Sequence, residues 1–255
     1  MTQESCPVTG VEEVGRNVYL LTFVARGISS SVKSGQFVNI RVGEGIEPLL
    51  RRPFSVYRTN GDEVQVIFNV VGKGTSALRK KNRGENIDVI GPLGVPYSLS
   101  GGAFKTGILV GGGLGVAPLP LATATLKVQG TPFATFLGAR TGDQLVETHL
   151  ENLRCATDDG TRGFHGTVLD LLKDSLTRNS IVNPKIFACG PTPMLRAVAS
   201  FARENAIPCE VSLEGAMACG IGICQGCPVE LVGAEKKYAL MCKDGPVFDI
   251  SRIVL

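Results

Sequence analysis

Apolar residues in the first hundred positions fall in short stretches rich in β-branched and aromatic side chains, and glycine-containing turns such as 60–62 separate them. Stretches of this kind predict β-strands. We place the strands at Val18–Ala25, Gln36–Val42, Phe54–Tyr57, Val64–Val71 and Ile87–Ile90, with one short helix at Thr75–Lys81. Strand after strand at this spacing favours a small antiparallel β-barrel, which we assign to residues 1–102.

After residue 102 the pattern changes to an alternation of strands and helices. The predicted strands are Thr106–Val110, Pro132–Leu137, Arg154–Thr157 and Lys185–Ala188. The predicted helices are Pro118–Val128, Asp143–Leu150, Thr167–Leu172 and Pro193–Asn205. Such alternation places crossover helices between parallel strands, so we expect an open parallel α/β sheet over 103–207. Residues 208–255 are rich in glycine and cysteine and too short to form much core alone, so we expect a small third module there.

Residues 106–126 hold no charged side chain, which meets the length criterion for a membrane-spanning helix. The same stretch carries five glycines and two prolines. A helix would lose stability at each of them, so a buried strand, a glycine turn and a helix start fit better. The N-terminal residues also lack a basic region followed by an apolar run. We therefore expect no secretion signal, no membrane partner and a cytoplasmic location.

Composition narrows the function. The chain has 255 residues, of which 44% are apolar and 19% charged, so it can bury a normal core in two or three domains. A net charge of +3 is too small to indicate nucleic-acid binding. Only two histidines are present, which nearly excludes a histidine-based metal site. The 32 glycines indicate backbone brought close to ligands or into tight turns.

Four of the eight cysteines lie within 24 residues: Cys219, Cys224, Cys227 and Cys242. The spacing C-x4-C-x2-C followed by a distant cysteine is the plant-type [2Fe–2S] arrangement. Glycines at 220, 222 and 226 let this loop curl, so that backbone N–H groups face the sulfurs and tune the potential. The alternative is structural zinc, which usually presents two paired C-x2–4-C knuckles where this chain has one. Buried cysteines without a metal are a third interpretation.

A glycine-rich turn, Gly111-Gly-Gly-Leu-Gly-Val-Ala-Pro118, follows the predicted strand at 106–110. A strand that runs into a glycine turn and a helix N-terminus can hold a pyrophosphate on free N–H groups. The dinucleotide motif G-x-G-x-x-G is incomplete, because Pro118 stands at the third glycine, although proline suits a first helical turn. A glycine turn that is only a tight connection remains the alternative.

A second turn, Cys189-Gly-Pro191, lies at the carboxyl end of a predicted strand, where open α/β sheets bind ligands. Its thiol could pack against a nicotinamide ring, or it could be a small buried apolar group. Arg140 follows the predicted strand at 132–137, where a basic residue could meet the 2′-phosphate of NADP. The loop that begins at Asp158 could approach a nicotinamide ribose or be a simple turn.

In the first region, Arg51-Arg52-Pro-Phe-Ser55 joins guanidinium groups, which suit a pyrophosphate, to a hydroxyl that could reach a cofactor ring. Gly72-Lys-Gly-Thr75 opens the predicted short helix and offers further N–H donors for phosphate. We assign no catalytic role to either histidine: His149 lies in the predicted helix at 143–150 and His165 in a loop.

Taken in order, these motifs resemble the ferredoxin-reductase-like flavoproteins and, more narrowly, the family of electron-transfer subunits of dihydroorotate dehydrogenase B. Arg52-Pro-Phe-Ser55 matches the family's FAD motif, and the turns at 111–118 and 189–191 match its nicotinamide motifs. The segments 212–222 and 242–248 match its cluster region, so that the resemblance covers practically the whole chain.

The resemblance implies three cofactors, FAD, NAD(H) and a [2Fe–2S] cluster, which supply the redox chemistry without a catalytic side chain. It implies the following FAD contacts: Arg52, Pro53, Phe54, Ser55, Ile67, Phe68, Asn69, Gly74 and Thr75. It implies the following NAD(H) contacts: Gly111, Gly112, Gly113, Gly115, Pro118, Cys189, Gly190 and Pro191. The cluster ligands would be Cys219, Cys224, Cys227 and Cys242.

The implied function is to pass electrons from NADH through FAD and the cluster to the FMN of a catalytic dihydroorotate dehydrogenase subunit, in pyrimidine biosynthesis. The implied assembly is a heterotetramer of two subunits of each kind. Length agrees with a separate partner, since a (β/α)₈ barrel needs about 250 further residues. Two alternatives are an NAD(P)H:ferredoxin or sulfide-type oxidoreductase subunit and a redox-sensing regulatory protein.

Overall fold

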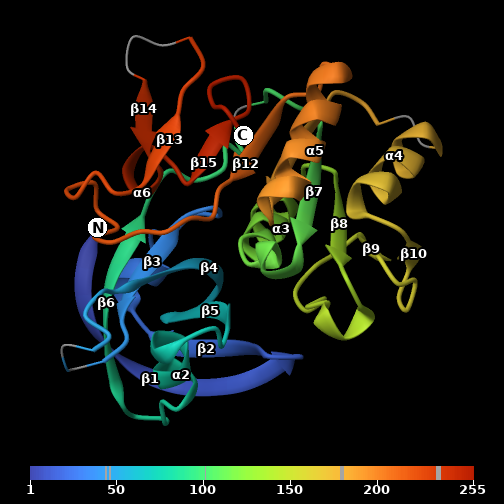
Figure 1. Cartoon of the computed structure of the whole chain (residues 1–255). Coiled ribbons are helices and arrows are strands. Elements are labelled where there is room, and N and C mark those ends of the chain that lie inside the picture. The colour runs from blue at the N-terminus through green and yellow to red at the C-terminus, as the bar shows by residue number, and fades with distance from the viewer. Residues whose placement is uncertain (44, 46, 101, 179–180, 234–236) are drawn as a thin grey trace.

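The computed structural model describes residues 1–255 apart from 44, 46, 101, 179–180 and 234–236. Two bodies lie side by side, a β-barrel formed by the first part of the chain and a sheet flanked by helices (Figure 1). The last part of the chain returns from the sheet and forms a small hairpin above the barrel (Figure 1). The molecule therefore places its C-terminal residues against both larger bodies.

The barrel is closed and antiparallel in the order β1-β2-β5-β4-β3-β6. Its strands are β1 (Thr2–Gly15), β2 (Val18–Val24), β3 (Phe37–Arg41), β4 (Arg52–Asn60), β5 (Glu63–Asn69) and β6 (Asn86–Leu93). Two short helices, α1 (Arg26–Ser29) and α2 (Lys73–Arg79), accompany them. The predicted barrel is confirmed, but the sequence analysis missed β1. This strand pairs with both β2 and β6 and closes the barrel.

The second body is a seven-stranded sheet in the order β10-β9-β8-β7-β11-β12-β15. Its strands are β7 (Thr106–Gly112), β8 (Phe133–Ala139), β9 (Leu153–Thr157), β10 (Phe164–His165), β11 (Pro184–Cys189), β12 (Cys209–Ser212) and β15 (Val247–Asp249). All neighbouring strands are parallel except β12 and β15. The helices are α3 (Leu119–Val128), α4 (Val168–Arg178) and α5 (Thr192–Glu204). The predicted α/β sheet is thus confirmed as a mostly parallel mixed sheet.

The C-terminal part contributes strands β12 and β15 to this sheet. Between them lie the hairpin of β13 (Pro228–Glu230) and β14 (Tyr238–Leu240) and the short helix α6 (Met241–Asp244). Apolar residues of the barrel, Phe37 and Leu93, share one buried cluster with Cys227 and Cys242. The cysteine-bearing module therefore has a common core with its two neighbours rather than one of its own.

The helix predicted at Asp143–Leu150 is wrong. A 3-10 turn, η2 (Gly142–Gln144), is followed by irregular backbone that packs on the barrel. The Tyr57 hydroxyl of β4 donates to the carbonyl of Thr148 at 2.7 Å. His149 has a φ of 62°, a left-handed conformation that interrupts a helix. Tertiary contacts with the barrel therefore replaced the local helical bonds, and His149 does not lie on a surface helix.

The uncharged stretch 106–126 folds as predicted into a strand, a turn and a helix start. Strand β7 ends at Gly112, the 3-10 turn η1 (Gly113–Val116) follows, and α3 begins at Leu119. Across the described ranges of the chain, no helix combines the length and apolar character that crossing a membrane requires.

Candidate functional site

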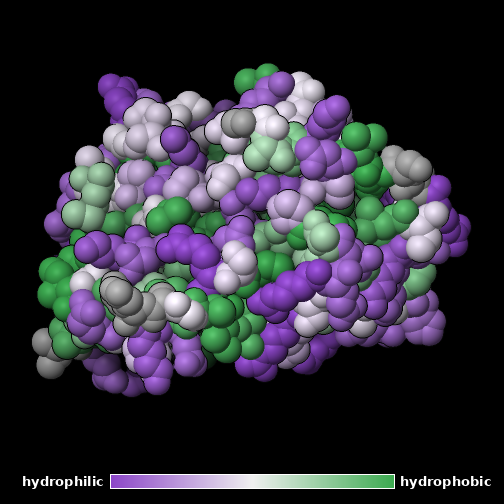
Figure 2. Space-filling view, turned by 90° about the horizontal axis from the view of Figure 1, so that it is seen from above, coloured by the Kyte–Doolittle hydropathy of each residue, from purple (hydrophilic) through white to green (hydrophobic). Residues whose placement is uncertain are grey.

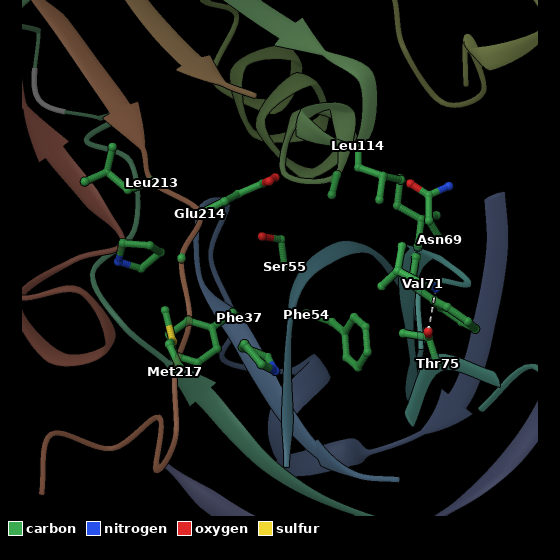
Figure 3. Close-up of a pocket in the computed structure, with 16 residues that line it drawn as sticks. Phe37, Phe54, Ser55, Asn69, Val71, Thr75, Leu114, Leu213, Glu214 and Met217 are labelled. Atoms are coloured by element: carbon green, nitrogen blue, oxygen red, sulfur yellow. Dashed lines mark hydrogen bonds between the residues drawn. The ribbon is translucent and has the colours of Figure 1, made fainter. Parts of the chain in front are cut away.

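A cavity of about 270 Å³ lies where three regions of the chain meet. Its walls come from β3, β4 and β5 of the barrel, from turn η1, and from the segment that follows β12 (Figure 3). Its volume is near the lower end for small-molecule sites, which typically have apolar walls with a few polar groups. The wall includes seven residues predicted from sequence: Pro53, Phe54, Ser55, Ile67, Phe68, Asn69 and Thr75.

The polar members of this wall are held by short hydrogen bonds within the barrel. The Thr75 hydroxyl accepts a hydrogen bond from the Val71 backbone N–H at 2.9 Å, which fixes the entry to α2. The Asn69 amide donates to the carbonyl of Asn17. Ser55, by contrast, faces the middle of the cavity in Figure 3. The hydroxyl of Ser55 is therefore the one placed to meet a ligand ring.

Two further predicted residues lie beside the cavity rather than in its wall. Arg52 donates from Nη1 to the carbonyl of Leu50 at 2.7 Å. Its Nε would lie only 3.2 Å from a Cβ added at Gly74, so a side chain at 74 would crowd the guanidinium. Arg52 and Gly74 therefore pack against each other beside Thr75, at the N-terminal end of α2.

A second cavity, of about 490 Å³, opens at the carboxyl edge of the sheet. It is lined by Gly112 and Gly113 from the glycine turn and by Pro191 from the second turn, as predicted. Arg140 and Asp158 line it as well. The location agrees with the rule that open α/β sheets bind ligands beyond the carboxyl ends of their strands.

The remaining predicted nicotinamide residues build the turns beneath this cavity. A Cβ at Gly115 would lie 2.1 Å from the carbonyl oxygen of Cys189, so only glycine lets the two turns touch. Gly190 approaches Gly112 in the same way, and Gly111 packs under side chains of the α/β body. Cys189 itself is buried, and burial raises its pKa. It is a neutral thiol in the core rather than a reactive one.

Pro118 has a structural contact. Its carbonyl accepts a hydrogen bond from the hydroxyl of Ser34 at 2.8 Å, which ties α3 to the barrel. A third cavity, of about 450 Å³, shares Asn69, Val71 and Leu114 with the first and Gly113 and Gln144 with the second. The three cavities are therefore neighbours with common walls, from the sheet edge to the barrel.

The four clustered cysteines lie on one loop and the adjoining helix α6. The sulfurs of Cys227 and Cys242 are 3.3 Å apart. The backbone N–H groups of Ile221 and Cys224 point at the sulfur of Cys219, at 3.5 and 3.4 Å. N–H groups directed at sulfur are the interactions that tune an iron–sulfur cluster.

The electrostatics of these thiols differ. Burial alone would raise the pKa of Cys219, but the N–H hydrogen bonds from Cys224 and Ile221 outweigh it and lower that pKa to about 6. Burial and the neighbouring Cys227 raise the pKa of Cys242 to about 12. The fold therefore favours the thiolate of Cys219, whereas Cys242 needs a metal to deprotonate it.

The donor set consists of four thiols, the ligands that an iron–sulfur cluster takes. The described residues contain no group of three or more His, Cys, Asp or Glu side chains already placed to hold a metal ion. Cys227 and Cys242 form one close pair of thiols, and Cys219 and Cys224 provide two more. Cys219 and Cys224 reach toward the surface, and Cys227 and Cys242 are buried.

Several cavity residues escaped the sequence analysis. Phe37, Leu114 and Met217 are apolar residues indistinguishable by pattern from ordinary core positions. Glu214 was noted only as part of the cluster segment, yet its carboxylate reaches into the cavity in Figure 3. Burial of the carboxyl group raises the pKa of Glu214. A carboxylate beside a run of glycine and small residues was the only available signal.

Comparison with known proteins agrees with this geometry. The family of iron-sulfur cluster binding domains of dihydroorotate dehydrogenase B matches residues 214–254. The dihydroorotate dehydrogenase B (NAD(+)) electron transfer subunit of Bacillus caldolyticus is 36% identical over an alignment of 265 positions that covers 99% of each chain. The subunit of the same name from Fusobacterium nucleatum is 35% identical and covers 97% of both chains.

Two solved structures extend the comparison. The structure of an NADH-dependent reduced ferredoxin-NADP oxidoreductase is similar at 32% identity and a TM-score of 0.86, and it covers 98% of this chain and 89% of that one. Phthalate dioxygenase reductase is similar at 15% identity and a TM-score of 0.66, over 94% of each chain. The second likeness concerns the fold alone, a barrel and an α/β sheet of the ferredoxin-reductase type.

Proposed function

The chain belongs to the family of dihydroorotate dehydrogenase B electron transfer subunits, which makes it an oxidoreductase subunit, and we propose that it carries electrons between NAD(H) and a partner's FMN through FAD and a [2Fe–2S] cluster. One observation carries the proposal. The cavity at the sheet edge, the barrel cavity and the cysteine loop are neighbours in that order. The third cavity joins the walls of the first two, and Met217 of the barrel cavity lies two residues before Cys219.

In this proposal residues 1–102 hold FAD, 103–207 hold NAD(H) and 208–255 hold the cluster. The flavin ring occupies the barrel cavity between Ser55 and Met217. Arg52 and the N-terminal turn of α2 hold the diphosphate. When bound, the flavin exchanges a hydride with the nicotinamide and single electrons with the cluster, which is the chemistry that a two-electron and a one-electron carrier need between them.

The turns at 111–115 and 189–191 hold the NAD(H) diphosphate and nicotinamide at the sheet edge. Their close packing through Gly115 brings Leu114 into the barrel cavity and Gly113 to the edge cavity. The same turn therefore lines both the proposed nicotinamide site and the proposed flavin site.

The partner is proposed to be the FMN-containing catalytic subunit of dihydroorotate dehydrogenase, in an assembly of two subunits of each kind. The tip of the cysteine loop supports contact with a partner, because Ile223 is 75% exposed and Cys224 is exposed beside it. Exposed Leu49 and Leu50 precede Arg51, which contacts the barrel strand beneath this loop. Figure 2 shows that the outer face seen from above mixes hydrophobic and hydrophilic residues.

The test is a visible spectrum of the purified complex, titrated anaerobically with NADH and, separately, with dihydroorotate. We expect FAD and both irons of the cluster in each chain, with bleaching of flavin and cluster bands by either reductant. Tightly bound zinc without flavin would contradict the proposal. Bleaching by NADH but not by dihydroorotate would contradict the assignment of the partner.

A second candidate is an NAD(P)H:ferredoxin oxidoreductase subunit, supported by the 32% identity to a structure of that activity. Co-purification distinguishes the two. A partner that contains FMN and binds orotate supports the first function. A partner without FMN, together with NADH-dependent reduction of ferredoxin, supports the second.

A further inference from the structure

A polar side chain of the barrel, Asn39, contacts the cysteine loop. Strand β3 alternates, so that Val38 and Ile40 face the barrel core while Phe37 and Asn39 face outward beneath the C-terminal module. Asn39 is only 1% exposed. Its Nδ2 donates to the carbonyl oxygen of Cys219, a proposed cluster ligand, at 3.0 Å.

The loop is shaped to receive this amide. Gly220 has a φ of 70°, and a Cβ at this position would lie 2.4 Å from Nδ2 of Asn39. A residue other than glycine would therefore push the loop off the strand. On the other side, Arg51 donates to the backbone carbonyl of Asn39 at 3.4 Å and forms an ion pair with Asp88. Asn39 is thus fixed from below and contacts the loop above.

The amide of Asn39 does not stabilise the barrel itself. Its Oδ1 is buried and meets no donor among the described residues. A buried acceptor without a partner costs free energy, whereas an apolar residue of similar shape would avoid that cost. The gain that offsets this cost is the hydrogen bond to the cysteine loop.

The same strand also lines the flavin cavity. Phe37 is in its wall, two residues from Asn39 on the same face, and Asn39 is paired across β4 with Pro53, another wall residue. We propose that Asn39 is a positioning residue that fixes the cysteine loop relative to the flavin cavity, and so sets the rate of electron exchange between flavin and cluster. This role rests on the proposed function.

The test compares Asn39→Leu with wild type in the complete complex with its partner. We expect unchanged FAD and iron content, unchanged flavin reduction by NADH, and a thermal midpoint that is equal or higher. Loss of one hydrogen bond should lower the population of the correctly placed loop by about tenfold. Cluster bleaching after NADH should therefore slow by about the same factor. The EPR signal of the reduced cluster should broaden, because the loop no longer holds one position.

The matched control is Gln65→Leu. Gln65 of β5 also has a buried oxygen without a partner among the described residues, and its Nε2 donates to the hydroxyl of Thr22 within the barrel. This variant should keep the wild-type cluster rate and EPR signal. If it slows cluster reduction as much as Asn39→Leu does, the proposed role is wrong.

A lower thermal midpoint in Asn39→Leu with an unchanged cluster rate would make Asn39 a barrel residue only and would overturn the inference. If Asn39→Leu does not fold, Asn39→Ser, in which a water can bridge the gap, should slow the cluster by less than tenfold. An unchanged rate in that variant would equally overturn it. Wild-type protein without flavin or iron would instead contradict the proposed function.

Discussion

The cysteine loop and the barrel cavity are neighbours, yet they are built in different ways. The four thiols come from 24 residues, and backbone N–H groups of the same segment are directed at the sulfur of Cys219. The cavity takes its wall from positions as far apart as Phe37 and Pro246, held by packing among three regions. Loss of one cysteine should therefore abolish metal binding at the loop without affecting the cavity. The cavity should instead lose its ligand when the three regions that form its wall are moved apart.

The largest expected effect comes from Cys219→Ser, which tests the local site. Loss of one thiolate should lower the iron content to near zero, because the cluster needs all four ligands. FAD content and flavin reduction by NADH should stay close to wild type, because Cys219 lies outside the cavity wall. Iron analysis and the flavin absorbance of the same sample measure both.

Cys155→Ser is the matched control for this change. Cys155 is a half-buried thiol of β9, in the α/β body. Full iron content is expected in this variant. Comparable iron loss in both variants would contradict the ligand assignment.

Gly115→Ala tests the barrel cavity, whose wall comes from three regions of the chain. The added methyl group would collide with the carbonyl of Cys189, so turn η1 must move away from β11. We expect a loss of about 1–3 kcal/mol in the free energy of unfolding. KM for NADH should rise and FAD should dissociate more readily, since the turn carries both Gly113 and Leu114.

The iron content of Gly115→Ala should be retained, which is the reverse of the Cys219→Ser result. Gly10→Ala is the control, because a Cβ at Gly10 has no atom within 4 Å and no left-handed backbone to strain. Loss of iron together with FAD in Gly115→Ala would show that the two sites are not separable.

The same contrast explains what the sequence could predict. The cysteine spacing and the two glycine turns are local patterns, and the structure places the cysteines on one loop and helix α6 and the turns at one sheet edge. Phe37 and Leu114 carry no such pattern, because an apolar wall residue has the same sequence signature as a core residue. Asn39 was also missed, since a single amide in a strand does not reveal its partner 180 positions later.

The errors in the fold have a similar cause. Strand β1 was missed because, of its first eight positions, only Cys6 and Val8 are buried, which leaves little alternation to detect. The segment 143–150 has helix-compatible residues, but contacts with Tyr57 and Arg58 of the barrel hold it in an irregular path. In both places the deciding interactions come from distant parts of the chain.

A smaller effect is expected from Arg52→Ala, which perturbs the flavin side without moving any region. We propose that this guanidinium contacts the FAD diphosphate, so its loss should weaken FAD binding by about 10- to 100-fold, the usual range for a charge-assisted hydrogen bond. Fluorescence of released flavin on dilution measures this. Arg26→Ala, which breaks an exposed ion pair with Asp62 elsewhere on the barrel, should bind FAD normally. Equal weakening in both variants would contradict the assignment of Arg52.

The smallest effect is expected from Asp88→Asn, beneath the cysteine loop. Burial alone would raise the pKa of Asp88, but hydrogen bonds from Arg51 and Gln3 outweigh it and hold that pKa below its usual value. A lowered pKa means that the carboxylate stabilises the fold at neutral pH, and that this contribution is lost as pH falls through the acid range below about 4. Because the pair is partly exposed, we expect Asp88→Asn to lose less than about 1 kcal/mol at pH 7.

Urea unfolding of both proteins, followed by circular dichroism from pH 7 to pH 3, should show the difference shrinking toward acid. Iron and FAD should be retained at pH 7, because Arg51 keeps its hydrogen bonds to the carbonyls of Asn39 and Asp88 without the ion pair. If Asp88→Asn instead loses iron, the cysteine loop depends on the barrel beneath it for more than the Asn39 contact. The cluster site would then be as distributed as the flavin cavity.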